Sequence, residues 1–271
     1  MRYIRLGKSN LEVSRLGLDC YALGIAQRDL GWDPFSYDGQ VFATRTVHAA
    51  LDAGINIFET SLDIEGGRAE SLLGKALQGK RAGALLASRL CKVASGSSIE
   101  ASVLVSMRRL RADHLDIIYL NDQLGQQSQQ PLDELVRMRE RGVVHHIGLA
   151  VTDPGMSQPL IENGQFDVAE LQCDASDTVE VSMLLDACDK RGMGVSINKP
   201  LGSETLQTLV RKLDSECTGI SKVRECCLRY LLSDRRIHLI NLGMRWEHEV
   251  ATNSQLVADL EPSYLPLALS T

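Results

Sequence analysis

Short apolar runs alternate with amphipathic segments over most of this 271-residue chain. Each run is bounded by polar residues or glycine, a pattern typical of strands that are buried on both faces. The predicted strands cover Arg15–Leu18, Ile55–Phe58, Ala84–Ala87, Ile117–Leu120, Val144–Leu149, Val168–Leu171, Gly194–Ile197 and Leu239–Leu242.

The segments between these runs show helical periodicity. The predicted helices cover residues 44–54, 69–79, 99–113, 131–142, 179–192 and 248–260. The first begins at a candidate cap, Thr44, and ends on Gly54. The fourth has Pro131 at its start and Gly142 just past its end, an arrangement that helix sterics favour.

Strand and helix alternate about every 30 residues, which indicates parallel strands joined by crossover helices. Eight such units favour an α/β fold of the closed (β/α)₈ TIM-barrel type over an open doubly wound sheet. No GxGxxG motif follows the first strand, which argues against a Rossmann fold. No linker divides the chain, so we expect one domain over residues 1–271, with loops at 29–40 and 121–131.

Composition and charge limit what kinds of molecule the protein is expected to bind. The net charge is −6 and no basic stripe is present, so nucleic acid is not expected as a partner. No apolar run approaches about 18 residues, and the N-terminus lacks the apolar core of a signal peptide, so we expect a cytoplasmic protein without a membrane span. The seven cysteines include no CxxC pair, and no metal site is expected, at His145–His146 or elsewhere. A small-molecule substrate fits these limits.

In a barrel of this kind the functional residues lie at the carboxyl ends of the strands. The sequence places one acid suited to proton transfer there, Glu59, together with cations, amides and a thiol. The strand-end residues are Asp19, Cys20, Glu59, Arg89, Asn121, Ala150, Gln172, Asn198, Lys199 and Gly243.

Several segments, in order, resemble the aldo-keto reductase family. The N-terminal YIRLGKSNLEVSRLGLDCYALG is similar to the family's opening β-hairpin and first strand. Later landmarks are ALDAGINIFETS, GRAESLLGKAL, LDIIYLND, GVVHHIGLA, FDVAELQC, GVSINKPLG and INLGMRWEHEVATN. The resemblance covers nearly the whole chain and implies a (β/α)₈ barrel with a short N-terminal hairpin that reduces carbonyls with NADPH.

The resemblance also implies a catalytic Asp-Tyr-Lys-His tetrad, and this chain departs from it at all four positions. Glu59 replaces the Asp, Ile64 the proton-donating Tyr, Arg89 the Lys and Asn121 the His. An aliphatic side chain cannot donate a proton, so the family's usual reaction should lose about 10²–10⁴-fold in rate. Glu59 and Arg89 are alternatively a buried ion pair that remains from the Asp–Lys pair.

The same resemblance implies a cofactor site of mixed character. The pair that holds the nicotinamide amide reads Ala150-Val151 here, whereas the phosphate-facing KPLG segment and the adenine end remain recognisable. NADP(H) binding is therefore left open. The candidate cofactor residues are Gln172, Asn198, Lys199, Leu201, Gly243, Arg245, Glu249 and Asn253.

Three functions remain open on the sequence. The first is acid–base conversion of a small carbonyl- or hydroxyl-bearing metabolite, such as a dehydration, isomerisation, elimination or cyclisation. Glu59 or Asp63 would then be the acid or base, Arg89 and Lys199 would bind an anionic group, and Asn121 would orient a carbonyl. Tyr21 could add a phenol, and Cys20 or Cys173 a thiol.

The second is an NADP(H)-dependent oxidoreductase with a substitute proton donor, such as Tyr21, Glu59 or water. The third is a non-catalytic ligand-binding or regulatory member. Because the family's extended C-terminal substrate loop has little counterpart here, we expect substrate contacts from residues 31–40, from 121–130 or from another subunit of an oligomer.

Overall fold

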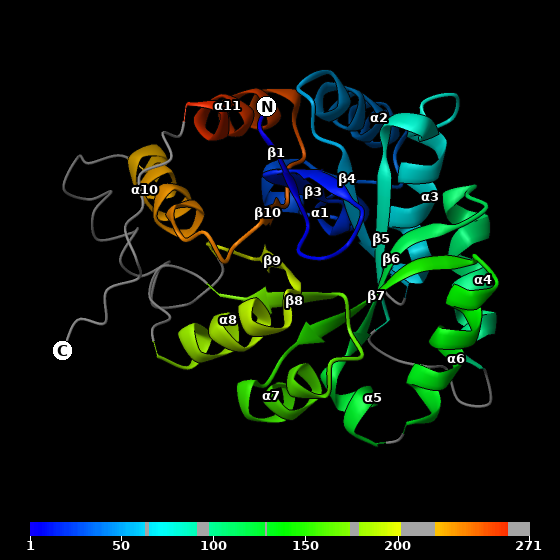
Figure 1. The fold of residues 1–271 in the computed structure, drawn as a ribbon. Coiled ribbons are helices and arrows are strands. Elements are labelled where there is room, and N and C mark those ends of the chain that lie inside the picture. The colour runs from blue at the N-terminus through cyan, green and yellow to red at the C-terminus, as the bar shows by residue number, and fades with distance from the viewer. Residues whose placement is uncertain (63–64, 91–97, 128, 174–178, 202–219, 260–271) are drawn as a thin grey trace.

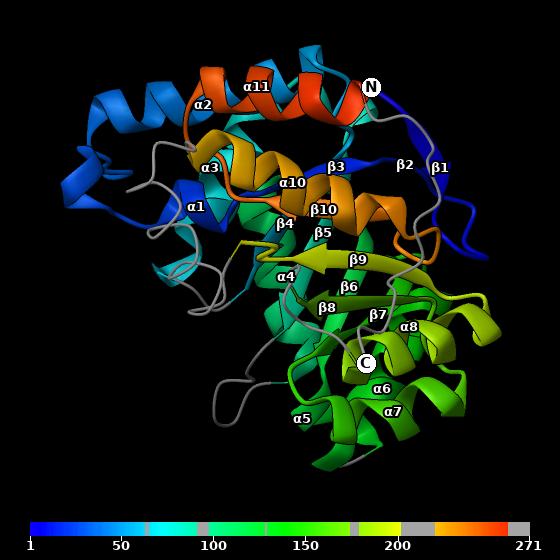
Figure 2. The same cartoon turned by 90° about the vertical axis from the view of Figure 1, so that its left-hand side faces the viewer.

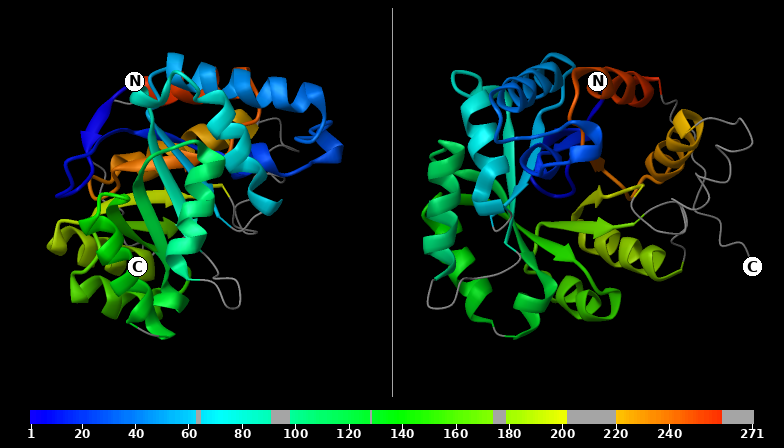
Figure 3. Two further views of the ribbon diagram at one scale, coloured as in Figure 1. Left: turned by 90° about the vertical axis from the view of Figure 1, so that its right-hand side faces the viewer. Right: turned by 180° about the vertical axis from the view of Figure 1, so that it is seen from behind.

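The computed structural model describes residues 1–271 except for 63–64, 91–97, 128, 174–178, 202–219 and 260–271. Eight parallel strands close into a barrel in which the last strand pairs with the first, surrounded by helices (Figures 1 and 3). The predicted (β/α)₈ class is thus confirmed. The strands are β3 (Leu16–Asp19), β4 (Ile57–Ser61), β5 (Leu85–Leu90), β6 (Leu115–Asn121), β7 (Val144–Val151), β8 (Val168–Gln172), β9 (Gly194–Asn198) and β10 (Leu239–Leu242).

All eight predicted strands are present, but most run further toward the carboxyl end than their apolar runs. β4 continues through Glu59 to Ser61, β5 reaches Leu90 past Arg89, and β6 includes Asn121. Polar side chains fit there because alternate residues of a barrel strand face the interior, which is polar at this end. These candidate site residues therefore belong to the strands themselves and not to the loops that follow them.

The outer ring consists of helices that connect successive strands. The longer ones are α2 (Tyr37–Asp52), α3 (Arg68–Ala76), α4 (Ile99–Leu110), α6 (Gln130–Glu140), α7 (Pro154–Asn163), α8 (Val179–Arg191), α10 (Ile220–Ser233) and α11 (Glu247–Ala258). Shorter turns are α1 (Tyr21–Gly24), α5 (Asp122–Gln127), η1 (Arg28–Leu30), η2 (Glu65–Gly67) and η3 (Arg81–Gly83). No helix in the described part of the chain has the length and apolarity that a membrane crossing needs.

Three boundary predictions were wrong. The helix predicted to begin at Thr44 begins a full two turns earlier, because Ser36 caps it: its Oγ accepts a hydrogen bond from Gly39 N at 3.0 Å. The segment 121–131, predicted as a loop, contains α5 and the start of α6. Likewise the predicted loop 29–40 contains the end of η1 and the start of α2.

A β-hairpin closes the end of the barrel where the strands begin (Figure 2). It consists of β1 (Tyr3–Arg5) and β2 (Glu12–Ser14), which pair antiparallel, as the sequence predicted. Leu6 and Val13 are fully buried and pack with the inward-facing apolar residues of the strands, Ile117 among them. A Cβ on Gly194 would lie 2.5 Å from Leu6 Cγ, so this glycine makes room for the plug. The barrel is therefore sealed at one end and polar at the other.

Candidate active site

A buried charge cluster lies inside the barrel, nearer the carboxyl ends of the strands than the apolar layer that the hairpin seals. Its centre is Arg89 of β5, which lies between Glu59 of β4 and Glu170 of β8. Arg89 Nη2 donates to Glu59 Oε1 at 2.6 Å and also to Glu170 Oε1, and Arg89 Nε donates to Glu170 Oε2 at 2.7 Å. Only 2% of either glutamate side chain and 13% of the arginine side chain are exposed. One guanidinium thus holds two carboxyl groups away from water.

Two asparagines complete the coordination of these carboxyl groups. Asn198 Nδ2 donates to Glu59 Oε1 at 3.1 Å and to Glu170 Oε1 at 2.7 Å. Asn241 Nδ2 donates to Glu59 Oε2 at 2.6 Å. A Cβ on Gly17 would lie 1.9 Å from Asn241 Oδ1, so Gly17 makes room for the asparagine. Every oxygen of the two glutamates therefore accepts at least one hydrogen bond.

The two glutamates differ in protonation because they share one positive charge. Burial, together with the negative charge of Glu170, raises the pKa of Glu59 well above its usual range. Burial acts on Glu170 as well, but the Arg89 guanidinium and the hydrogen bonds to it outweigh that effect and lower the pKa of Glu170. Two carboxylates in a low-dielectric site cannot both ionise easily. Glu59 is therefore the more readily protonated of the two, while Glu170 is the carboxylate that pairs with Arg89.

A third carboxyl group, Asp19, lies beside the cluster at the end of β3. Asp19 is in register with Glu59 and is 9% exposed. Its Oδ1 accepts a hydrogen bond from Tyr21 N at 2.9 Å. Burial raises the pKa of Asp19 to about 6, even though the Tyr21 N–H and the Arg89 charge favour the carboxylate. Asp19 is thus an acid whose proton is labile near neutral pH.

The other predicted catalytic residues lie around the cluster rather than in it. Asn121 is 8% exposed, but its Oδ1 accepts from Gln123 N at 2.9 Å and so helps to begin α5. Tyr21 is 41% exposed at the start of α1. Asp63, like Ile64, lies outside the described residues. Cys20 is fully buried, and burial raises the pKa of its thiol well above the usual range, so it is no nucleophile at neutral pH.

The residues predicted to hold the nicotinamide end differ in exposure. Asn198 is 2% exposed and its amide is bound to the two glutamates. Gln172 is exposed at the end of β8, two residues beyond Glu170, which is the residue of this strand that faces the charge cluster. Lys199 is exposed and has φ of 51°, a left-handed conformation that is uncommon for a residue other than glycine. Leu201 is half-buried just beyond it.

The residues predicted for the adenosine end gather where β10 leads into α11. Gly243 is exposed, and Arg245 and Glu249 are half-buried. Glu249 Oε2 accepts from Arg245 N at 2.7 Å and from Trp246 N at 3.1 Å, so this carboxylate is used to begin the helix.

Three polar atoms in this region are buried and have no hydrogen-bond partner among the described residues: Arg245 Nε, a donor, Asn253 Oδ1, an acceptor, and the Ser254 hydroxyl. Buried polar atoms are normally paired, so each orphan calls for an explanation. The Arg245 donor could pair with a phosphate oxygen, and the Asn253 acceptor could pair with an adenine amino group. Together these atoms fit the phosphate and adenosine part of a dinucleotide. The residues present therefore fit a nicotinamide cofactor at this end.

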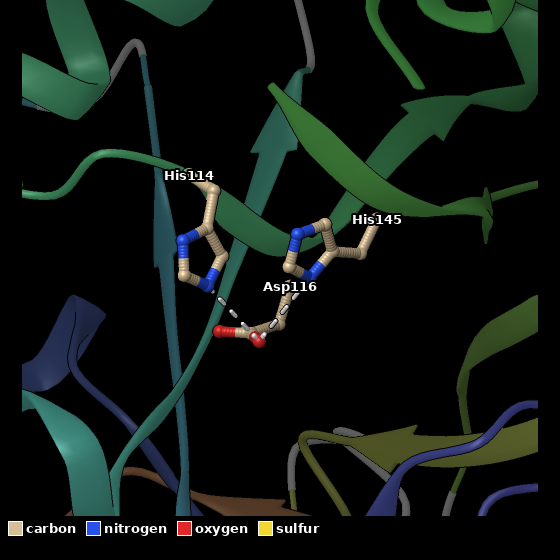
Figure 4. A group of neighbouring side chains, drawn as sticks. All are labelled: His114, Asp116 and His145. Carbon is tan, nitrogen blue, oxygen red and sulfur yellow. Dashed lines mark ion pairs between the residues drawn. The ribbon is translucent and has the colours of Figure 1, made fainter. Parts of the chain in front are cut away.

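A second group of titratable side chains lies at the opposite end of the barrel, where β6 and β7 begin. His114, Asp116 and His145 bring ligand atoms within 4.8 Å of one another (Figure 4). Arg81 Nη2, however, lies 3.1 Å from His114 Nε2 and 3.0 Å from Asp116 Oδ2. The guanidinium thus places positive charge where a cation would need to bind. We interpret this group as an ion-pair network that fixes the strand starts.

Sequence reasoning missed Glu170 and Asn241 and left Asp19 among the strand-end residues without a role. A signal was present for Glu170: it is an acid in the middle of the apolar strand VAELQ. An ionisable residue in a strand buried on both faces needs a charged partner. The pattern could not show that this partner is Arg89, which is 81 residues distant along the chain.

A closed (β/α)₈ barrel that carries buried acids and an arginine at the carboxyl ends of its strands has the architecture of an enzyme barrel. The sequence profile of the Aldo/keto reductase family matches residues 22–261. The chain belongs to the aldo-keto reductase family. Among curated proteins it is similar to the L-galactose dehydrogenase of Arabidopsis thaliana, with 26% identity over 290 residues, 94% of this chain and 88% of that protein.

A second relative, the NADH-specific methylglyoxal reductase of Escherichia coli, is 26% identical over 225 residues, 74% of this chain and 68% of that protein. Among solved structures, the holo form of an aldo-keto reductase from Bacillus halodurans matches with a TM-score of 0.78 at 21% identity and covers 97% of this chain and 92% of that one. An aldo-keto reductase from Klebsiella pneumoniae in complex with NADPH matches with a TM-score of 0.75 at 16% identity, covering 96% and 90%. At these identities the structural likeness concerns the fold.

Proposed function

We propose that the chain is an NADP(H)-dependent oxidoreductase that interconverts a carbonyl and an alcohol on a small hydroxylated metabolite. The observation that carries this proposal is the pair of buried, unpartnered polar atoms on Arg245 and Asn253, which a dinucleotide would satisfy. The names of the relatives, a dehydrogenase and a reductase, support the reaction class. The NADPH complex of the Klebsiella pneumoniae protein supports the cofactor.

The chain's own side chains supply the acid–base part of such a reaction. A bound nicotinamide would give or accept the hydride. Arg89 fixes Glu59 and Glu170 in place, and burial raises the pKa of Glu59 well above its usual range. The buried carboxyl groups at the strand ends, Asp19 and Glu59, are the candidate proton sources where the resemblance places Ile64 in the position of the family's tyrosine.

Cofactor binding is tested by titrating the purified protein into NADPH and, separately, NADH, and following the nicotinamide fluorescence. We expect saturable binding that Arg245→Ala and Asn253→Ala each weaken at least tenfold, since each removes an atom that would pair with the ligand. Arg229→Ala removes an exposed arginine on α10 and is the matched control, expected to leave the Kd unchanged. A wild-type protein that binds neither nucleotide would refute the cofactor assignment.

Turnover is tested with methylglyoxal and other small aldehydes as reduction substrates, and with L-galactose and related sugars as oxidation substrates. Nicotinamide absorbance should change in step with substrate loss. Binding of NADPH without any turnover across this panel would leave a ligand-binding role and argue against an oxidoreductase.

A second candidate function is acid–base conversion without hydride transfer. It is favoured by one observation: the Asn198 amide, expected near the nicotinamide, is bound to Glu59 and Glu170 instead. In this case a substrate would be dehydrated or isomerised with no change in nicotinamide absorbance and no need for added cofactor. Product analysis by mass spectrometry in the absence of nucleotide separates the two functions.

A further inference from the structure

The three carboxyl groups of the site differ in whether they can reach a substrate. Glu59 is 1% exposed, and its oxygens accept hydrogen bonds from Arg89, Asn198 and Asn241. Glu170 is 2% exposed, and both of its oxygens accept from Arg89. To give or take a proton directly, either group would have to break bonds inside the barrel. Every oxygen of this deep pair is therefore already engaged in a hydrogen bond.

Asp19 is placed differently. It is the last residue of β3, at the carboxyl end of the barrel, next to the exposed Tyr21. Its Oδ1 is held by the Tyr21 N–H at 2.9 Å, which fixes the side chain. Within the described ranges, no hydrogen-bond donor reaches its Oδ2, although the residue is nine-tenths buried. One oxygen is anchored, and the other accepts no hydrogen bond from the described residues.

We propose that Asp19 is the catalytic acid and base of this site, with its Oδ2 exchanging the proton of the substrate's hydroxyl or carbonyl oxygen. This inference rests on the proposed oxidoreductase function. In alcohol oxidation the O–H bond would break and its proton would go to Asp19, while the hydrogen on the same carbon would leave as hydride, which a bound oxidised nicotinamide would accept, and a C=O bond would form. In reduction the carbon accepts hydride, and the oxygen takes the proton back from Asp19. Asp19 then exchanges its proton with solvent.

Charged groups from every neighbouring element act on Asp19. The negative charge of Glu170 favours the protonated form of Asp19, whereas the positive charges of Arg89 and Lys199 favour its carboxylate. The charge of Asp19 in turn raises the pKa of Glu59. Arg245 also feels the charge of Asp19. Burial is the largest influence and raises the pKa to about 6. A group with this pKa is chiefly a base at pH 7 and an acid below pH 6, which suits oxidation at neutral pH.

The rates of oxidation and reduction should depend on pH in opposite senses. Oxidation needs the carboxylate and should rise with pH through about 6, whereas reduction needs the carboxylic acid and should fall with pH through the same value. Measurements of kcat against pH in both directions on the full-length protein, with the aldehydes and sugars named above, test these opposite limbs.

The decisive variants are Asp19→Asn and Asp19→Glu. Asp19→Asn should lower kcat about 10²–10⁴-fold and remove both limbs, while the Kd for NADPH changes less than about threefold because the amide keeps the hydrogen bond to Tyr21 N. Asp19→Glu should restore part of the activity with a displaced limb. The matched control is Asp153→Asn, since Asp153 also accepts from a local backbone N–H, that of Met156 at 3.0 Å, and it should leave kcat unchanged.

A second readout does not depend on turnover. The infrared carboxyl band that wild-type protein loses as the pH rises through about 6 should be missing from Asp19→Asn. Active wild-type enzyme together with Asp19→Asn of near-normal kcat and an unchanged pH profile would overturn the inference and leave the proposed function intact. If instead Tyr21→Phe loses the pH dependence of kcat near pH 6, the group that transfers the proton is the Tyr21 phenol, which would also overturn the inference. Wild-type protein with neither nucleotide binding nor turnover would overturn both proposals.

Discussion

Replacing Arg89 with Met should destabilise the protein strongly, in a way that depends on pH. The substitution keeps an unbranched side chain of similar length but removes the guanidinium between Glu59 and Glu170. Both glutamate side chains are 2% exposed, so water cannot take over the role of the arginine. Loss of one partner from a buried ion pair costs about 3–5 kcal/mol. For a protein of this size that corresponds to a decrease in Tm of about 6–20 °C.

The destabilisation should shrink as the pH falls. In the wild type Arg89 lowers the pKa of Glu170, so this pair stabilises the fold above the unfolded-state pKa of about 4.3 and loses that effect as Glu170 is protonated. In the variant, burial without a guanidinium raises the pKa of both glutamates. The variant fold then binds more protons than the unfolded chain, and acidification stabilises it. The difference between the two proteins is therefore expected to be largest near pH 7 and smaller near pH 5.

Urea denaturation followed by circular dichroism at pH 7 and pH 5 measures both effects. Arg229→Met is the matched control: its Nε lies 2.8 Å from Glu225 Oε1, but both side chains are 42% exposed, and such pairs contribute about 0–0.5 kcal/mol. The reasoning is refuted if Arg89→Met loses less than about 1 kcal/mol at pH 7, or if its loss is the same at both pH values.

Three further predictions concern stability. Asp116→Ala should lower the free energy of unfolding by about 1–3 kcal/mol in urea, because its Oδ2 accepts from the buried Leu86 N at 2.8 Å and that donor would be left unpaired; an unchanged midpoint would contradict this. Leu6→Ala should lose about 2–5 kcal/mol by the same measurement, since Leu6 is fully buried in the barrel plug, whereas a loss below about 1 kcal/mol would mean that the hairpin does not seal the barrel. Gly17→Ala should lower the Tm measured by calorimetry, because overpacking against Asn241 Oδ1 costs about 1–3 kcal/mol, and a Tm equal to the wild type would show that the asparagine can move freely.

The sequence predicted the start of the barrel strands better than their ends. Val144, Val168, Gly194 and Leu239 each begin a strand as predicted, because apolar runs define strands that lie under helices. At the carboxyl ends the interior becomes polar, and residues such as Asn121 continue the strand although they interrupt the apolar run. A pattern that recognises buried strands by apolar character alone therefore stops short of the site.

For the site itself, the sequence predicted which residues lie at the carboxyl ends of the strands, but not which of their side chains contact one another. The Glu59–Arg89 ion pair was anticipated and is present at 2.6 Å. That Glu170 shares the same guanidinium depends on the shear of the closed barrel, which relates strands far apart in sequence. The single-domain organisation over residues 1–271 and the role of Asp63 stay predictions.

The Asn241–Glu59 hydrogen bond has a consequence for how the chain folds. Its two residues are 182 positions apart, and Asn241 belongs to the strand that closes the barrel. During synthesis, Glu59 leaves the ribosome long before the partner of its Oε2 exists. Loop closure over such a distance makes this contact late in folding, because non-local contacts form only after the intervening chain is ordered. Until β10 pairs with its neighbouring strands, Glu59 Oε2 lacks the hydrogen-bond donor that Asn241 supplies. A chain truncated before residue 241 is therefore expected to leave the barrel interior accessible to water and to chaperones.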